Sequence, residues 1–178
     1  MIDIKELSYQ ESQKFISAFD TLEESLYISH TDRNFSDWVD VEEVRARYIW
    51  LVEDMEKPLG FLSYRVLILP NKIDFIYIVK IYVLKSHREE NPILVEEERV
   101  SEILFREIDR RNVNILTLES ACKKLDRYYE SLGFEYNKEI SDIFAQEIKT
   151  TEQIMYRKKK DIEINLSDEE KKMFGNRI

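Results

Sequence analysis

The spacing of apolar and polar residues predicts that the chain opens with one strand followed by short helices. Residues Ile2–Leu7 alternate weakly between apolar and polar side chains, which indicates a strand. Ser8 and Glu11 then have the spacing of a capping box, in which the two side chains satisfy the first backbone N–H groups of a helix. The same spacing recurs at Asp20 and Asp40, so we expect two more short helices before the next apolar run.

Three apolar runs in the middle of the chain predict an antiparallel sheet. They are rich in β-branched and aromatic residues and comprise Tyr48–Val52, Gly60–Leu69 and Phe75–Val83. The turn-like segment Glu53–Pro58 makes the first two runs a hairpin. The third run is apolar on both faces, which favours a central position in the sheet.

The second half of the chain predicts a parallel strand-helix-strand unit. Asn91 and Pro92 suit a helix start, and apolar residues recur at helical spacing up to Arg111, which would make this the longest helix. The run Val113–Leu118 follows as a strand parallel to Phe75–Val83. The pattern closes with a helix that ends at a glycine, two strands and a capped helix in the tail: Lys123–Leu132, Asp142–Ile148, Ile154–Arg157 and the segment from Ser167.

Length and composition favour one globular domain that needs no metal. With 43% hydrophobic residues in 178, the chain is neither disordered nor of low complexity. The net charge of −9 disfavours nucleic acid and an anionic membrane as partners. The N-terminus lacks a signal peptide and no apolar run spans a bilayer, so we expect a cytoplasmic protein. The single cysteine, Cys122, and two histidines leave little capacity for a metal ion, and we expect none.

The order of these elements, together with three short segments, resembles the GNAT superfamily of N-acetyltransferases that use acetyl-coenzyme A. Val79–Leu84 is similar to the end of the family's central strand, and Leu116–Leu118 is similar to its next strand. Tyr129–Phe134 is similar to a family segment that ends in Gly-Phe. The resemblance implies a three-layer α/β/α sandwich with a mixed, mostly antiparallel sheet. It covers one domain, residues 1–158, and leaves 159–178 as a charged tail.

The loop after the central strand differs from the family's pattern. In the family it carries Arg/Gln-x-x-Gly-x-Gly/Ala, whose glycines let backbone N–H groups approach the coenzyme pyrophosphate at a helix N-terminus. Counting forward along the chain places Arg88–Leu94 there, counting back places Pro92–Glu97 there, and neither segment contains a glycine. Five nearby glutamates, at 89, 90 and 96–98, would oppose an anionic ligand unless their side chains point to solvent.

The resemblance implies one catalytic residue and a set of coenzyme contacts. Tyr129 matches the tyrosine that protonates the departing thiolate in many members of the family, and a core role is its alternative. The coenzyme contacts that the resemblance implies are Ile81, Tyr82, Val83, His87, Arg88, Asn91 and Cys122. His87 and Arg88 could instead be an exposed basic pair that balances the glutamates, and Cys122 a buried small hydrophobe.

The resemblance also implies where the acceptor substrate binds. His30 and Asp32 lie in the loop between the N-terminal helices, which in this fold borders the acceptor pocket. Lys80 interrupts an apolar strand near the place where the family often has an acidic base, so we expect it to contact substrate. Asp74 or Glu53 could then serve as the base through a water molecule.

Two main function classes follow for this chain. The first is an N-acetyltransferase that transfers an acetyl group from acetyl-coenzyme A to a primary amine, and the Tyr129–Phe134 segment favours it. The second is a GNAT-like binding or regulatory protein that has lost coenzyme binding, and the glycine-free loop favours it. An interaction module working through an acidic surface is a third class. A homodimer stays open.

The distribution of charge suggests a class of acceptor. From Asp20 to Glu43 the chain has eight carboxylates and one basic residue, Arg33. A negative wall beside the acceptor site would attract a cationic small molecule or a lysine side chain of a peptide. Several of these carboxylates also suit helix N-caps and first turns, whatever the ligand.

Overall fold

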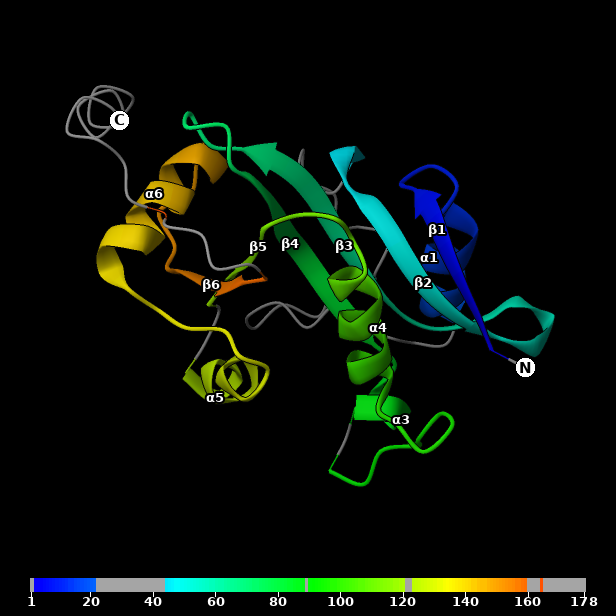
Figure 1. Ribbon diagram of the computed structural model, residues 1–178. Helices are drawn as coiled ribbons and strands as arrows, with labels where there is room; N and C mark the ends of the chain where they lie inside the picture. Colours follow the sequence, from blue (N-terminus) through cyan, green and yellow to red (C-terminus); the bar gives the residue numbers. More distant parts are fainter. Residues whose placement is uncertain (1, 22–43, 89, 121–122, 160–163, 165–178) are drawn as a thin grey trace. The chain divides into compact units, whose positions relative to one another are not determined.

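The computed structural model describes residues 2–21, 44–88, 90–120, 123–159 and 164, and these contain a six-stranded sheet (Figure 1). The strands follow one another across the sheet in chain order: β1 (Asp3–Ser8), β2 (Arg47–Glu53), β3 (Lys57–Ile68), β4 (Asp74–Val83), β5 (Ile115–Glu119) and β6 (Ile154–Lys158). The helices are α1 (Gln13–Thr21), the 3-10 turn η2 (Asp54–Glu56), α3 (Lys85–Arg88), α4 (Val100–Asp109), α5 (Lys123–Ser131) and α6 (Lys138–Ile148).

The sheet is mixed and mostly antiparallel, as predicted. β1 pairs with β2, β2 with β3, and β5 with β6 in antiparallel fashion. β4 and β5 are parallel, with Phe75–Ile78 opposite Ile115–Leu118. The helix α4 lies between these two strands in sequence, as a parallel connection requires.

The chain divides into two compact units that each contain parts of β3 and β4. One unit comprises Met1–Tyr64 and Val79–Arg111, and the other comprises Arg65–Ile78 and Asn112–Ile178.

In the first unit, helices cover both faces of the sheet. The rings of Phe15 and Phe19, on α1, lie 5.1 and 5.5 Å from that of Trp50, which pairs with Phe61. The neighbouring residue Gly60 faces Val100 of α4, where a Cβ atom on the glycine would lie 3.1 Å from Val100 Cγ1. Successive residues of a strand point to opposite faces, so α1 and α4 lie on opposite sides.

In the second unit, α5 and α6 also lie on opposite faces. Phe144 of α6 packs against Phe75 and Tyr156, at ring distances of 4.9 and 6.2 Å. The next residue of β6, Arg157, donates from Nη1 to the carbonyl oxygen of Leu132, just after α5, at 2.9 Å. Both units therefore have the three layers of the predicted α/β/α sandwich.

Two predicted elements were wrong. Asp142–Ile148 is part of helix α6, because Asn137 caps Ile140 and the buried residues Ser141, Phe144 and Ile148 recur at helical spacing. The expected long helix does not start at Asn91 and Pro92. A turn occupies Val95–Glu98 instead, so α4 has 10 residues and α6, with 11, is longer.

The N-terminal capping box is confirmed. The backbone N–H of Ser8 donates to Glu11 Oε1 at 3.0 Å, and the N–H of Glu11 donates to Ser8 Oγ at 3.1 Å. The predicted apolar positions of α1 are buried. Asp20 lies within α1 rather than at the start of a new helix.

The other short helix predicted before residue 46 and the tail helix at Ser167 fall largely or wholly outside the described residues. None of the helices in the described part of the chain is both long and apolar enough to cross a membrane.

Candidate functional site

The end of β4 and the short helix α3 bring together several of the predicted coenzyme contacts. Ile81 is half-buried, while Tyr82 and Val83 are buried. Arg88 folds back from α3, donating from Nη1 to the carbonyl oxygen of Val83 at 3.1 Å, with its guanidinium 5.3 Å from the Tyr82 ring. This arrangement fixes a cationic group beside the end of the central strand.

His87 and Arg88 are not an exposed basic pair. His87 is buried, with 6% of its surface exposed, and its Nδ1 lies 2.9 Å from Ser86 Oγ. Arg88 is half-buried, and Lys85, at the start of α3, is exposed. Asn91 is exposed in the loop that follows.

A tight turn precedes α4 in the place of the family's glycine-rich loop. Val95 and Glu98 exchange two backbone hydrogen bonds, of 2.8 and 3.0 Å. The two residues between them, Glu96 and Glu97, have φ angles of 49° and 68°. These are left-handed conformations that glycine adopts at least cost. The loop therefore adopts, with glutamates, backbone angles for which glycine is the usual residue.

The described glutamates of this loop do not form a buried cluster of negative charge. Glu90, Glu96 and Glu97 are exposed to solvent. Glu98 pairs with Arg106, whose Nη1 donates to its Oε1 at 2.6 Å. Hydrogen bonding to Arg106 is the main cause that lowers the pKa of Glu98. The objection to an anionic ligand is weakened, because the exposed carboxylates can remain in water and Glu98 is neutralised by its partner.

Lys80 lies on β4, two residues before Tyr82. Lys80 as a whole is half-buried, and its Nζ atom is shielded from solvent. Its predicted contact with substrate stays a prediction.

The segment similar to the family's Gly-Phe motif forms the C-terminal cap of α5. The N–H groups of Phe134 and Gly133 donate to the carbonyl oxygens of Tyr129 and Glu130, at 3.1 and 2.9 Å. Gly133 has a φ of 93°, and the Phe134 ring lies 6.2 Å from that of Tyr129. This is a Schellman motif with its characteristic hydrophobic contact. Tyr129 is buried, and its backbone anchors the cap.

Arg157 on β6 holds this cap, a role that the sequence pattern does not indicate. It donates to the carbonyl oxygen of Leu132, lies 5.5 Å above the Phe134 ring, and its Cδ would be 3.1 Å from a Cβ atom on Gly133. Burial lowers the pKa of Arg157 from its ordinary value. Arg157 and Gly133 are 24 positions apart in the chain, so no local pattern could have joined them.

Tyr156, the neighbour of Arg157, is also buried. Burial first, and then a hydrogen bond to Glu135, raises the pKa of Tyr156 to about 12. Tyr156 therefore stays protonated at neutral pH.

The structure gives a context to some of the other predicted residues. Asp74, one candidate base, accepts a hydrogen bond from Asn114 Nδ2 at 2.6 Å, and Glu53 is half-buried at the end of β2. His30, Asp32 and Cys122 lie outside the described residues. Within the described ranges, no group of three His, Cys, Asp or Glu side chains could hold a metal ion.

Comparison with known proteins finds the likeness in structure alone. No protein-family profile and no curated protein sequence matches the chain. An acetyltransferase of the GNAT family from Staphylococcus aureus Mu50 is similar, with a TM-score of 0.57 and 17% identity, over 90% of this chain and 100% of that one.

Two further solved structures give the same result. An acyl-CoA N-acyltransferase from Pseudomonas aeruginosa has a TM-score of 0.55 at 12% identity, over 88% of this chain and 99% of that one. An aminoglycoside acetyltransferase from an uncultured soil metagenomic sample has a TM-score of 0.54 at 15% identity, over 77% and 93%. The predicted resemblance is confirmed at the level of architecture, and the chain has the fold of the GNAT superfamily.

Proposed function

We propose that the protein is an N-acetyltransferase that transfers an acetyl group from acetyl-coenzyme A to a primary amine. The observation that carries the proposal is the C-terminal cap of α5. In it, Tyr129 is buried and fixed by two hydrogen bonds to its carbonyl oxygen and by the Phe134 ring. This is the residue that matches the family's proton donor, on a chain with the family's fold.

The residues around α4 fit the phosphate groups of coenzyme A. The first backbone N–H groups of a helix have no partner within the helix and carry partial positive charge. The turn at Val95–Glu98 leads directly into this helix start, with Arg99 as its N-cap. Lys85 and Arg88 add positive charge on α3 in the same unit.

Each residue would then have a limited chemical task. Bound acetyl-coenzyme A supplies a thioester, and transfer to an amine releases the coenzyme as a thiolate. Tyr129 would donate its phenolic proton to that sulfur. The acceptor must lose a proton before its nitrogen can attack, and Asp74 or Glu53 could accept that proton through water.

The acceptor class rests on charge. We expect a cationic small molecule or a lysine side chain, because residues 20–43 carry eight carboxylates and one arginine. His30, Asp32 and Lys80 are the proposed contacts.

Calorimetry with acetyl-coenzyme A tests the proposal. We expect binding, and we expect Tyr129→Phe to lower turnover about 10²-fold while the affinity for the coenzyme changes little, because only proton donation is lost. Tyr128→Phe is the matched control, since Tyr128 is the adjacent, half-buried tyrosine with its ring 5.8 Å away.

Two outcomes would contradict the proposal at different points. The first outcome is that millimolar coenzyme produces no heat and no thermal shift. This result would favour the non-catalytic binding protein, and the glutamates of the loop would then explain why the coenzyme does not bind. Binding with an unchanged rate in Tyr129→Phe would assign Tyr129 to the core alone.

A further inference from the structure

The two outermost strands of the sheet differ in how their outer edges are covered. β6 is the last strand on one side, and β1 is the last on the other. Outermost strands present rows of backbone N–H and C=O groups that can pair with another chain.

The outer edge of β6 is closed by other parts of its own unit. The N–H of Ile154 donates to Ser141 Oγ of α6 at 2.8 Å. Tyr156 exchanges backbone hydrogen bonds with Glu135, of 2.9 and 3.0 Å. A further strand therefore cannot add to this edge without displacing them.

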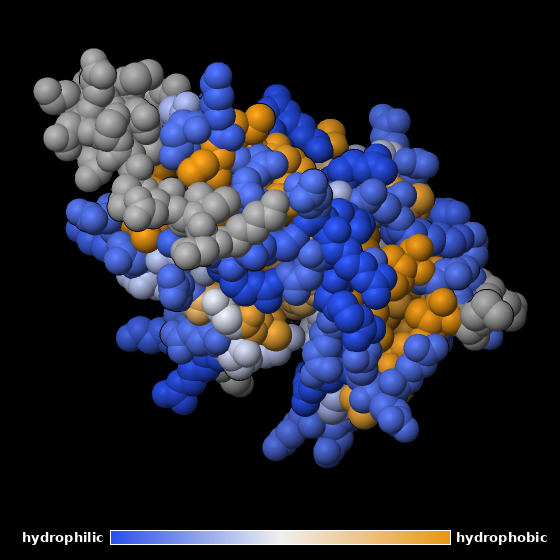
Figure 2. Space-filling view, viewed as in Figure 1, coloured by the Kyte–Doolittle hydropathy of each residue, from blue (hydrophilic) through white to orange (hydrophobic). Residues whose placement is uncertain are grey.

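β1 has β2 on one side, and no strand of the described residues lies on the other (Figure 1). Ile4, the second residue of β1, is 41% exposed. The face seen in Figure 2 is largely hydrophilic with scattered apolar patches. Of the large exposed apolar residues described, Ile4 is on an outermost strand, whereas Val66 and Ile68 are on β3.

We propose that β1 pairs with β1 of a second copy of this chain, antiparallel and centred on Ile4. Two copies of one strand pair about a two-fold axis, and residues directly opposite each other must lie on the same face of the sheet. The axis therefore passes midway between the two copies of one residue, which face each other. An axis through Asp3, Lys5 or Glu6 would place identical charges opposite each other.

Among the registers centred on a residue of β1, the one centred on Ile4 places opposite charges across from each other with both residues inside the strand. It places Ile4 opposite Ile4, and it places Asp3 of each copy opposite Lys5 of the other. The symmetry makes two such opposite-charge pairs. A register centred on Leu7 is also apolar at its centre, but it aligns Lys5 with Tyr9 and Glu6 with Ser8, so it gains no ion pair.

Lys5 is available for this contact. Its Nζ lies 2.9 Å from Glu56 Oε1, and its side chain is 31% exposed. Glu56 has a second cation, Lys14, at 3.4 Å, so it keeps a partner if Lys5 turns toward Asp3 of the other copy.

Sedimentation equilibrium of the full chain tests the association. We expect a species of twice the 21.5 kDa chain mass, and we expect Ile4→Lys to raise the dissociation constant about tenfold or more, because it places two ammonium groups at the axis. Ile68→Lys is the matched control, since Ile68 is a 59% exposed isoleucine on β3, and it should leave the mass unchanged.

A charge exchange tests the register. Asp3→Lys makes both facing positions basic and Lys5→Glu makes both acidic, so each variant alone should be weakened about tenfold. A mixture of the two variants should form a heterodimer. In it, the lysine introduced in the first variant faces the glutamate introduced in the second, and the unchanged Lys5 of the first faces the unchanged Asp3 of the second.

Three results would overturn the proposal. They are a wild-type chain that stays monomeric at the highest soluble concentration, single charge variants that dimerise like the wild type, and a mixture that gains no dimer over its components. Circular dichroism of each variant shows that the fold is intact, so a lost dimer reports the edge and not unfolding.

Discussion

At the scale of single residues, the left-handed backbone positions of this protein are not all occupied by glycine, so a search for glycines finds only some of them. Five described residues other than glycine have positive φ: Glu56, Lys72, Glu96, Glu97 and Lys149. Such conformations cost roughly 1 kcal/mol or more for residues with a Cβ atom. Gly133, by contrast, occupies its left-handed position at little cost, and it was the position that the sequence pattern identified.

Replacement of Gly133 tests the cap of α5. We expect Gly133→Ala to lower the free energy of unfolding by about 1–2 kcal/mol, because alanine is strained at a φ of 93° and its Cβ would press on the Arg157 side chain. Urea unfolding measures the change.

Gly133→Asn is the comparison for this prediction. Asparagine also has a Cβ atom but tolerates the left-handed region, so it should cost less than alanine. If both variants were as stable as the wild type, the cap would not depend on the glycine.

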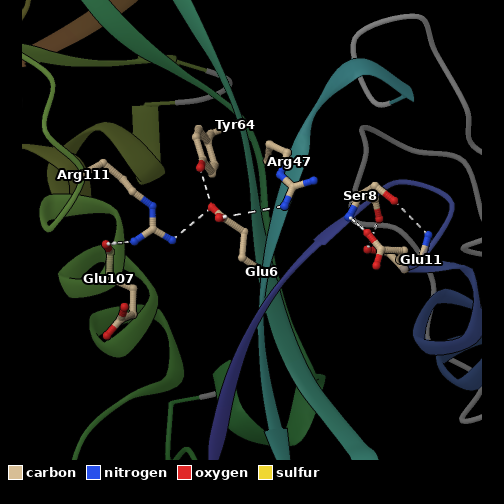
Figure 3. A network of polar contacts seen from close by, with 8 residues as sticks. Glu6, Ser8, Glu11, Arg47, Tyr64, Glu107 and Arg111 are labelled. Carbon is tan, nitrogen blue, oxygen red and sulfur yellow. Dashed lines mark hydrogen bonds and ion pairs between the residues drawn. The ribbon is translucent and has the colours of Figure 1, made fainter.

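At the scale of elements, a polar cluster joins three strands of the first unit to the segment just after helix α4 (Figure 3). Glu6 on β1 accepts a hydrogen bond from the Tyr64 hydroxyl on β3, and Arg111 Nη2, just after α4, donates to Glu6 Oε1 at 3.1 Å. Arg47 Nη2 lies 4.0 Å from Glu6 Oε2. Burial raises the pKa of Glu6, but Tyr64, Arg111 and Arg47 together outweigh burial and hold that pKa below its ordinary 4.5.

Removal of the Glu6 charge should therefore destabilise the protein in a pH-dependent way. A lowered pKa in the folded state means that ionised Glu6 stabilises the fold above the unfolded pKa, and that this contribution is lost as pH falls. We expect Glu6→Gln to lower the free energy of unfolding by about 1 kcal/mol at neutral pH, a modest value because the side chain is 35% exposed.

The difference between Glu6→Gln and the wild type should shrink as pH falls below about 4.5, since wild-type Glu6 is then protonated as well. Urea unfolding at a series of pH values measures it. Glu152→Gln, which removes an exposed carboxylate outside this cluster, is the control. A difference that stayed constant with pH would show that charge at Glu6 is not the cause.

At the scale of the whole molecule, the net charge of −9 is its strongest long-range property. Most of the excess lies in residues 20–43, and under the proposed function this negative charge would attract a cationic acceptor. Under the proposed function, the anionic coenzyme would need basic partners within this acidic protein, and Lys85, Arg88 and Arg99 are the residues proposed for that role.

A panel of acceptors at low and high salt tests this steering. We expect spermidine-like amines to react faster than neutral or acidic amines of similar size, and we expect salt to reduce that preference, because exposed charges are screened within about 8 Å at physiological ionic strength. Equal rates for all acceptors, or a preference insensitive to salt, would remove electrostatic attraction as the explanation.

The sequence by itself determined those features that depend on near neighbours. The Ser8–Glu11 capping box, the apolar face of α1, the β-branched strands and the glycine stop of α5 each depend on residues within a few positions of one another. They appear in the structure as predicted. Local hydrogen bonding and side-chain periodicity are physically encoded over those distances.

Only the tertiary structure decided the features that depend on distant partners. The sequence pattern of Asp142–Ile148 allowed a strand, but the segment is a helix. The helix buries Phe144 against Phe75, and its Ser141 Oγ accepts a hydrogen bond from the N–H of Ile154. The turn before α4 has glutamates at left-handed positions where the family resemblance implies glycines, because surrounding contacts can hold a strained backbone. Arg157 reaches the cap of α5 across the fold, and that contact exists only after the chain has brought β6 and α5 together.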